Sequence, residues 1–173
     1  MVRTFQFALA PASLAAIAAL ATALITPALA QNAGQVSRVQ SSGASCPGCD
    51  LLQAELSYMT LLGRDFSGAR LMQAGLTAGI YDGTRFNNAN LRFLEGSASR
   101  FARANFAGAD LSDAALVGSY FGGARFTRAN LAGANLSGSD FSTARGLTQS
   151  QLDQACGDAE TLLPPGLSVP FCR

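Results

Sequence analysis

The stretch Phe101-Ala-Arg-Ala-Asn-Phe106-Ala-Gly-Ala-Asp-Leu111 carries a large apolar residue at every fifth position. The same period runs from Leu51 to Phe141, where nineteen such centres comprise ten Leu, seven Phe, one Tyr and one Gly. A small residue usually precedes each centre by two positions, and Gly often follows it by two. A period of five fits neither an α-helix nor a flat strand. It favours a chain that turns a corner every five residues.

The centres separate by residue type when they are read at intervals of twenty, whereas an interval of fifteen would mix Leu with Phe. One column is all Leu, one is all Phe and one is almost wholly aromatic: Leu51, Leu71, Leu91, Leu111 and Leu131; Phe66, Phe86, Phe106 and Phe126; Leu61, Tyr81, Phe101, Phe121 and Phe141. Like side chains therefore stack in successive coils, which predicts an all-β solenoid with four sides and twenty residues per coil. We expect coils to stack at a spacing of about 4.8 Å.

Gly96 interrupts the fourth column, and Leu94 occupies the small position paired with it. We expect the large side chain to have moved two residues along while the interior volume is kept. One degenerate repeat with a local bulge is the alternative.

These units resemble the pentapeptide-repeat family, whose unit reads A-[DN]-L-x-x. The resemblance covers residues 49–145 and implies a right-handed quadrilateral β-helix, which we place at residues 46–145 with about five 20-residue coils. Met59 and Arg64 depart from the pattern because they stand where a small residue is expected. Some family members mimic DNA with an acidic face and bind gyrase. That role is kept as an alternative, and the charged rows argue against it because they are mixed in sign.

Residues 1–30 have the features of a signal peptide. Arg3 precedes an apolar stretch from Phe5 to Ile25, and Ala28-Leu29-Ala30 is a cleavage pattern that would leave Gln31 as the mature N-terminus. An uncleaved membrane anchor is the alternative. Cleavage predicts a periplasmic or secreted bacterial protein without a stable membrane span, and with eleven Arg against eleven Asp and Glu. Residues 31–45 are polar, without an apolar period, and we expect a flexible lead.

Four cysteines in an exported chain predict disulfides, for which three pairings are open. Cys46 with Cys49 and Cys156 with Cys172 are the simplest pairs, since each joins sequence neighbours. Residues 146–173 break the five-residue register, and Thr148 with Gln151 forms a capping box that opens a short helix. We therefore expect a C-terminal cap closed by a disulfide.

The sequence contains no His, and all twelve of its basic residues are Arg. It therefore lacks the commonest general base and the usual amine nucleophile. No motif indicates a catalytic, metal or cofactor site, and a zinc site would need all four cysteines together. We predict a non-enzymatic structural or protein-interaction scaffold, with thiol–disulfide activity at Cys46 and Cys49 as a further alternative.

A candidate interaction patch lies in the first coils, where Leu52, Tyr58, Leu62 and Met72 are expected to project outward. Such a patch would bind an unidentified protein partner rather than nucleic acid, and it would allow a homodimer through one end of the solenoid. The alternative is that the lead covers these four residues.

Overall fold

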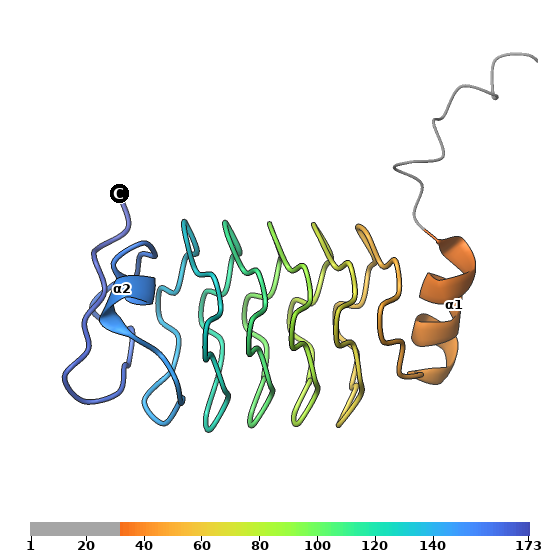
Figure 1. Ribbon diagram of the computed structural model, residues 1–173, viewed down its shortest axis with the longest axis horizontal. Coiled ribbons are helices and arrows are strands. Elements are labelled where there is room, and N and C mark those ends of the chain that lie inside the picture. Colours follow the sequence, from red (N-terminus) through yellow and green to blue (C-terminus); the bar gives the residue numbers. More distant parts are fainter. Residues whose placement is uncertain (1–31) are drawn as a thin grey trace, which may run out of the picture. The chain divides into compact units, whose positions relative to one another are not determined.

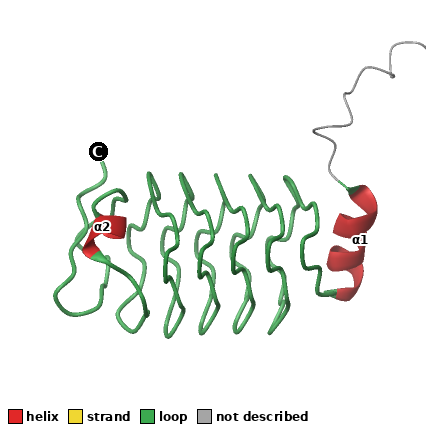
Figure 2. Ribbon diagram, in the orientation of Figure 1, coloured by secondary structure: helices red, strands yellow, loops and turns green. Residues whose placement is uncertain are grey.

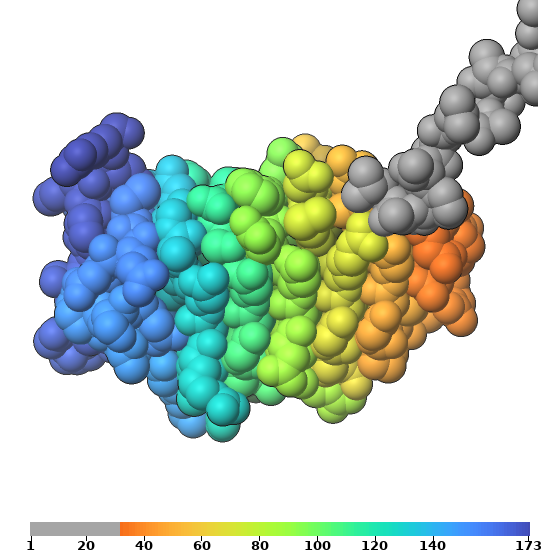
Figure 3. Space-filling model, turned by 45° about the horizontal axis from the view of Figure 1, so that its top comes forward, coloured from red at the N-terminus to blue at the C-terminus, as the bar shows by residue number. Residues whose placement is uncertain are grey.

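The computed structural model describes residues 32–173, so the predicted signal peptide lies outside the described residues. Two helices, α1 (Ala33–Ser42) and α2 (Gln149–Leu152), flank a stack of coils. The coils follow one another in sequence order (Figure 1), and on the face shown in Figure 3 they adjoin as successive bands of colour. This part of the chain is a β-helical solenoid.

Parallel β-bridges join residues that are twenty positions apart. They form four rows, which begin with the bridges Asp50–Arg70, Glu55–Gly75, Thr60–Ile80 and Asp65–Arg85. We name the sides by these rows: side 1 contains residues 49–53, side 2 residues 54–58, side 3 residues 59–63 and side 4 residues 64–68, each repeated every twenty residues. Each side contributes one bridge residue per coil, so Figure 2 draws the coils as loops without strand arrows.

Aromatic rings fill half of the solenoid interior. Phe86, Phe106 and Phe126 stack with centroids 5.2 and 5.1 Å apart. The neighbouring column meets this stack edge to face, as in the pair Phe101–Phe106 with centroids 5.5 Å apart. Both arrangements are favourable for aromatic quadrupoles. The two predicted aromatic columns therefore lie on adjacent sides and contact each other through the core.

The predicted exchange of volume at Leu94 and Gly96 is confirmed. Leu94 is fully buried, and its Cδ2 lies 3.4 Å from the position that a Cβ would take at Gly96. Leu116 of the next coil lies still closer, with Cδ2 3.1 Å from that position. The interior is filled from the neighbouring positions, so a glycine at this centre leaves no bulge.

A row of buried hydroxyls on side 3 was not anticipated from the sequence. Ser99 and Ser119 each donate to a backbone carbonyl 23 residues earlier, at 2.5 and 2.7 Å, and Ser139 makes the equivalent bond. Each serine hydroxyl also accepts from the backbone N–H twenty residues earlier. The row thus satisfies inward-facing backbone groups that water cannot reach.

Tyr81 takes over this bond where the serine row is interrupted by Gly79. Its hydroxyl donates to Leu56 O at 2.6 Å, the carbonyl that a serine at position 79 would bind. A Cβ at Gly79 would overlap the Tyr81 ring and hydroxyl. Burial raises the pKa of Tyr81 above its ordinary range, so the hydroxyl stays a donor at physiological pH.

The expected flexible lead is wrong for most of residues 31–45, because α1 occupies Ala33–Ser42. Asn32 caps the helix by accepting from Gln35 N–H, and Gly43 ends it in the left-handed conformation. Val36 and Val39, three residues apart, are buried in the core cluster. This helix forms because the first coil has no coil before it, and two valines suffice to cover its open end.

The C-terminal segment continues the backbone pairing in altered register. Bridges join Asn135 to Cys156 and Asp140 to Leu162, separations of 21 and 22 residues instead of 20. Thr148 N–H donates to Gln151 Oε1, and Gln151 Nε2 donates to the Phe126 and Ala129 carbonyls. These bonds dock α2 on the last regular coil, where Leu152 is fully buried.

Candidate interaction surfaces

The predicted apolar patch is wrong in one of its four members. Leu52 is 4% exposed, whereas Tyr58 is 80% and Leu62 54% exposed, and Met72 is half-buried. Two hydrogen bonds place helix α1 beside Leu52. Gln35 accepts from Asp50 N–H, and Gln40 donates to Glu55 O. The prediction failed because it treated residues 31–45 as unstructured.

The four residues also do not form one patch. Leu52 and Met72 share a row on side 1, whereas Leu62 lies on side 3 and Tyr58 at the corner before it. Sides 1 and 3 face in opposite directions in a four-sided coil. The predicted patch grouped four residues that were expected to face outward, although they lie on different sides of the coil.

Side 3 instead carries exposed apolar residues in several coils. Ile80 and Tyr120 are 38% and 43% exposed, and they join Tyr58 and Leu62, so we call these four residues the side-3 patch. Arg100, between Ile80 and Tyr120 in the bridge row, pairs with Asp82 at 3.0 Å and lies 5.9 Å from the Tyr120 ring centroid. The sequence could have indicated Ile80 and Tyr120, because most repeats carry a polar or charged residue directly before the centre.

An open groove of about 400 Å³ lies at the corner between sides 1 and 2. It is lined by Gln53, Glu55, Gln73, Phe93 and Glu95. Gly75 leaves space in this row, and the Glu55 carboxylate folds into it, with Oε2 2.5 Å from where a Cβ would stand. The groove is shallow and acidic, with one exposed aromatic side chain.

The cysteines form two disulfides, Cys46–Cys49 and Cys156–Cys172. Cys46 and Cys49 are 3% and 7% exposed, in the core cluster beside α1. Thiol–disulfide exchange needs a sulfur that an attacking thiolate can reach. This burial argues against the thiol–disulfide alternative and favours a role in closing the first coil.

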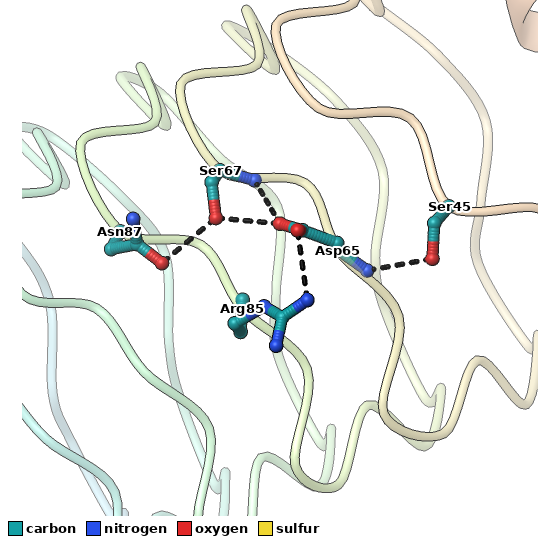
Figure 4. Close-up of polar contacts among 5 residues, drawn as sticks. All are labelled: Ser45, Asp65, Ser67, Arg85 and Asn87. Carbon is teal, nitrogen blue, oxygen red and sulfur yellow. Dashed lines mark hydrogen bonds and ion pairs between the residues drawn. The ribbon is translucent and has the colours of Figure 1, made fainter.

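Asp65 is the centre of a polar network on side 4 (Figure 4). Its carboxylate accepts from the Ser67 hydroxyl at 2.5 Å and from Arg85 at 2.9 Å, and Ser67 also contacts Asn87 at 2.8 Å. The Ser67 hydrogen bond, followed by Arg85, lowers the pKa of Asp65 to about 2. The network joins adjacent coils through their outer surface.

The surface charges do not form the continuous acidic face that DNA mimicry requires. The bridge row of side 1 reads Asp50, Arg70, Asn90, Asp110 and Asn130, and Arg70 pairs with Asp50 at 3.1 Å. Along residues 50–145, none of the four rows is uniformly acidic.

The described residues supply neither a metal-binding cluster nor a membrane-spanning helix. In residues 32–173, no group of three or more His, Cys, Asp or Glu could hold a metal ion. Over the same residues, neither helix combines the length and apolar character needed to cross a bilayer.

Comparison with known proteins identifies the repeat. Residues 97–144 match the family model for pentapeptide repeats in eight copies. No curated protein matches the chain.

Among solved structures, a pentapeptide repeat protein from the thylakoid lumen of Arabidopsis thaliana is similar to this chain. The two are 28% identical with a TM-score of 0.58, over 60% of this chain and 72% of the other. HetL, a pentapeptide repeat protein involved in heterocyst differentiation regulation in the cyanobacterium Nostoc, is 20% identical with a TM-score of 0.33, over 69% and 64%. QnrB1, a plasmid-mediated fluoroquinolone resistance protein, is 18% identical with a TM-score of 0.30, over 66% and 76%. The similarity to the Arabidopsis protein supports a right-handed β-helical solenoid.

Proposed function

Because this chain is a pentapeptide-repeat protein, we propose that it is a non-enzymatic scaffold of the bacterial envelope that binds a protein partner through its side-3 patch. The scaffold would be a four-sided stack of about five coils, closed at its C-terminal end by the Cys156–Cys172 segment. The exposure of Leu62 on side 3 and of Tyr58 at its corner carries this proposal. Exposed aromatic and aliphatic side chains on a fixed surface are the usual anchors of protein interfaces.

An exported location is supported by independent features. Residues 1–30 have the signal-peptide pattern, and two disulfides are typical of proteins in oxidising compartments. The similar Arabidopsis protein comes from the thylakoid lumen. N-terminal sequencing of protein recovered from the periplasm tests export, and we expect it to begin at Gln31. An intact N-terminus on a membrane-bound product would contradict cleavage.

Pull-down from periplasmic extract tests the binding function. We expect the wild-type chain to retain a partner that Tyr58→Ser/Leu62→Asp loses, with affinity reduced about thirtyfold or more if both residues are interface hot spots. Phe93→Ser is the matched control, because Phe93 is exposed on side 1.

Equal retention by all three proteins would contradict binding through side 3. Light scattering on the same samples distinguishes a foreign partner from a second copy of this chain. A dimer that Leu62→Asp disrupts would identify the partner as the chain itself.

A further inference from the structure

Four exposed arginines on and beside side 4 lack an ionic partner. The ion pairs within residues 32–173 use Arg70, Arg85 and Arg100. Four exposed arginines without an ion pair in this part of the chain gather around side 4, and we call them the arginine face: Arg103, Arg125, Arg128 and Arg145. Arg125 and Arg145 lie on the side itself, and Arg103 and Arg128 lie at its two corners.

These arginines are close along the solenoid axis. Arg125 and Arg145 are β-bridge partners in adjacent coils, so like charges stand directly opposite each other, an arrangement that is normally unfavourable. The Arg103 stem lies across Gly123, with Cγ 3.4 Å from where a Cβ would stand, which directs it toward the coil of Arg125. Three successive coils thus present their positive charges together.

Side 4 itself holds no acid beside the arginine face. Asp65, the only acid on side 4, pairs with Arg85 in the first coils. On the flanking sides, Asp110 and Asp140 accept from Ser112, Asn130 and Ser142 N–H, which orient these carboxylates without neutralising them. Asp113 lies at the far corner of side 1, away from side 4. The arginine face therefore carries a local excess of positive charge although acids and arginines are equal in number after residue 30.

The composition of side 4 indicates which kind of anion it suits. Its other outward residues are small or polar as far as Thr127, namely Ser67, Asn87, Asn105, Ala107 and Thr127, and Leu147 in the last coil is half-buried against the core. It has no aromatic side chain to stack on bases and no apolar centre for a tight protein interface. A charged lipid surface needs neither feature, because clustered basic residues bind anionic headgroups through electrostatics alone.

We propose that the arginine face docks the solenoid on an anionic phospholipid membrane, with side 4 against the headgroups. The contact is peripheral and reversible, because the face carries no apolar residue to insert. It is independent of the side-3 patch, which faces another direction. Each arginine near an anionic surface strengthens binding about fivefold, and added salt screens the attraction.

Vesicle co-sedimentation tests this proposal with protein recovered after export. The probes are vesicles of equal parts phosphatidylglycerol and phosphatidylcholine, with pure phosphatidylcholine vesicles as the uncharged control. We expect binding to the anionic vesicles only, and loss of that binding at high salt. Arg125→Gln/Arg145→Gln should weaken it about 25-fold, since two arginines are removed.

Two matched variants test whether vesicle binding depends on the arginine face itself rather than on net charge or on correct folding. Arg92→Gln/Arg173→Gln removes two arginines elsewhere and should bind like the wild type. Arg125→Lys/Arg145→Lys keeps the charge and should also bind. Equal weakening of both glutamine variants, equal binding to both vesicle types, or binding to soluble polyphosphate but not to vesicles would overturn the proposal.

Discussion

The interior and the outer surface of the same coils follow different rules. Inward columns keep one type of residue every twenty positions, as in the all-Phe column that begins at Phe66. The adjacent outward row on side 4 reads Asp65, Arg85, Asn105, Arg125 and Arg145. Close packing restricts each inward side chain to a size and shape that its neighbours in two coils accept. Outward side chains meet water, so charge and chemistry can vary there without loss of the fold.

Two exceptions show what the interior conserves. Leu94 supplies the volume that Gly96 lacks, and Tyr81 supplies the hydroxyl that Gly79 lacks. In both cases the neighbour two residues away compensates within the same side. From coil to coil, the interior therefore keeps the same total volume and hydrogen bonding rather than the same residue at each position.

Leu94→Ala should give the largest effect, because it empties a site that Gly96 cannot fill. We expect a loss of about 2–5 kcal/mol in the free energy of unfolding, measured by urea denaturation. Leu94→Ala/Gly96→Leu restores the pattern of the other coils and should recover most of this loss. If the double variant is no more stable than Leu94→Ala, compensation within the side is wrong.

Tyr81→Phe removes the hydroxyl that serves Leu56 O. We expect a loss of about 1–1.5 kcal/mol, because this carbonyl keeps only a long bond from Met59 N–H at 3.4 Å. Gly79→Ser alone should also destabilise, since its Cβ would overlap the Tyr81 ring.

The double variant Gly79→Ser/Tyr81→Phe reproduces the Ser99–Phe101 pair of the next coil. It should be more stable than the sum of the two single losses predicts. Strict additivity in urea denaturation would show that the two positions do not compensate each other.

Asp65→Asn tests the outer surface and should have a smaller effect, about 0.5–1 kcal/mol at neutral pH. The pKa of Asp65 falls from 3.8 to about 2 on folding, so its contribution is present above pH 3.8 and is lost as the pH falls toward 2. The variant should show a shallower loss of stability over this range. Parallel acid-unfolding profiles for the two proteins would contradict this assignment.

Arg145→Gln should give the smallest change, and in the opposite direction. Relief of repulsion from Arg125 should raise the free energy of unfolding by a few tenths of a kcal/mol, measured by urea denaturation at low salt. High salt should remove the gain. A loss of stability would mean that Arg145 has a stabilising contact.

The sequence alone determined the solenoid and most of its interior. The five-residue period, the columns at twenty and the exchange at Leu94 are all local or strictly periodic, and packing leaves no other register. The exposure of Tyr58 and Leu62 followed from the same register.

Only the tertiary structure decided what the ends and the sides do. Residues 31–45 form α1 because an open coil end is available to cover, and Leu52 is buried beside that helix. The Tyr81 hydroxyl takes the place of a serine hydroxyl and binds a carbonyl 25 residues earlier in the chain. The arginine face joins residues from three coils, and its lack of ion pairs follows from the side-chain contacts of those coils. These features depend on contacts between distant residues, which a repeating pattern does not encode.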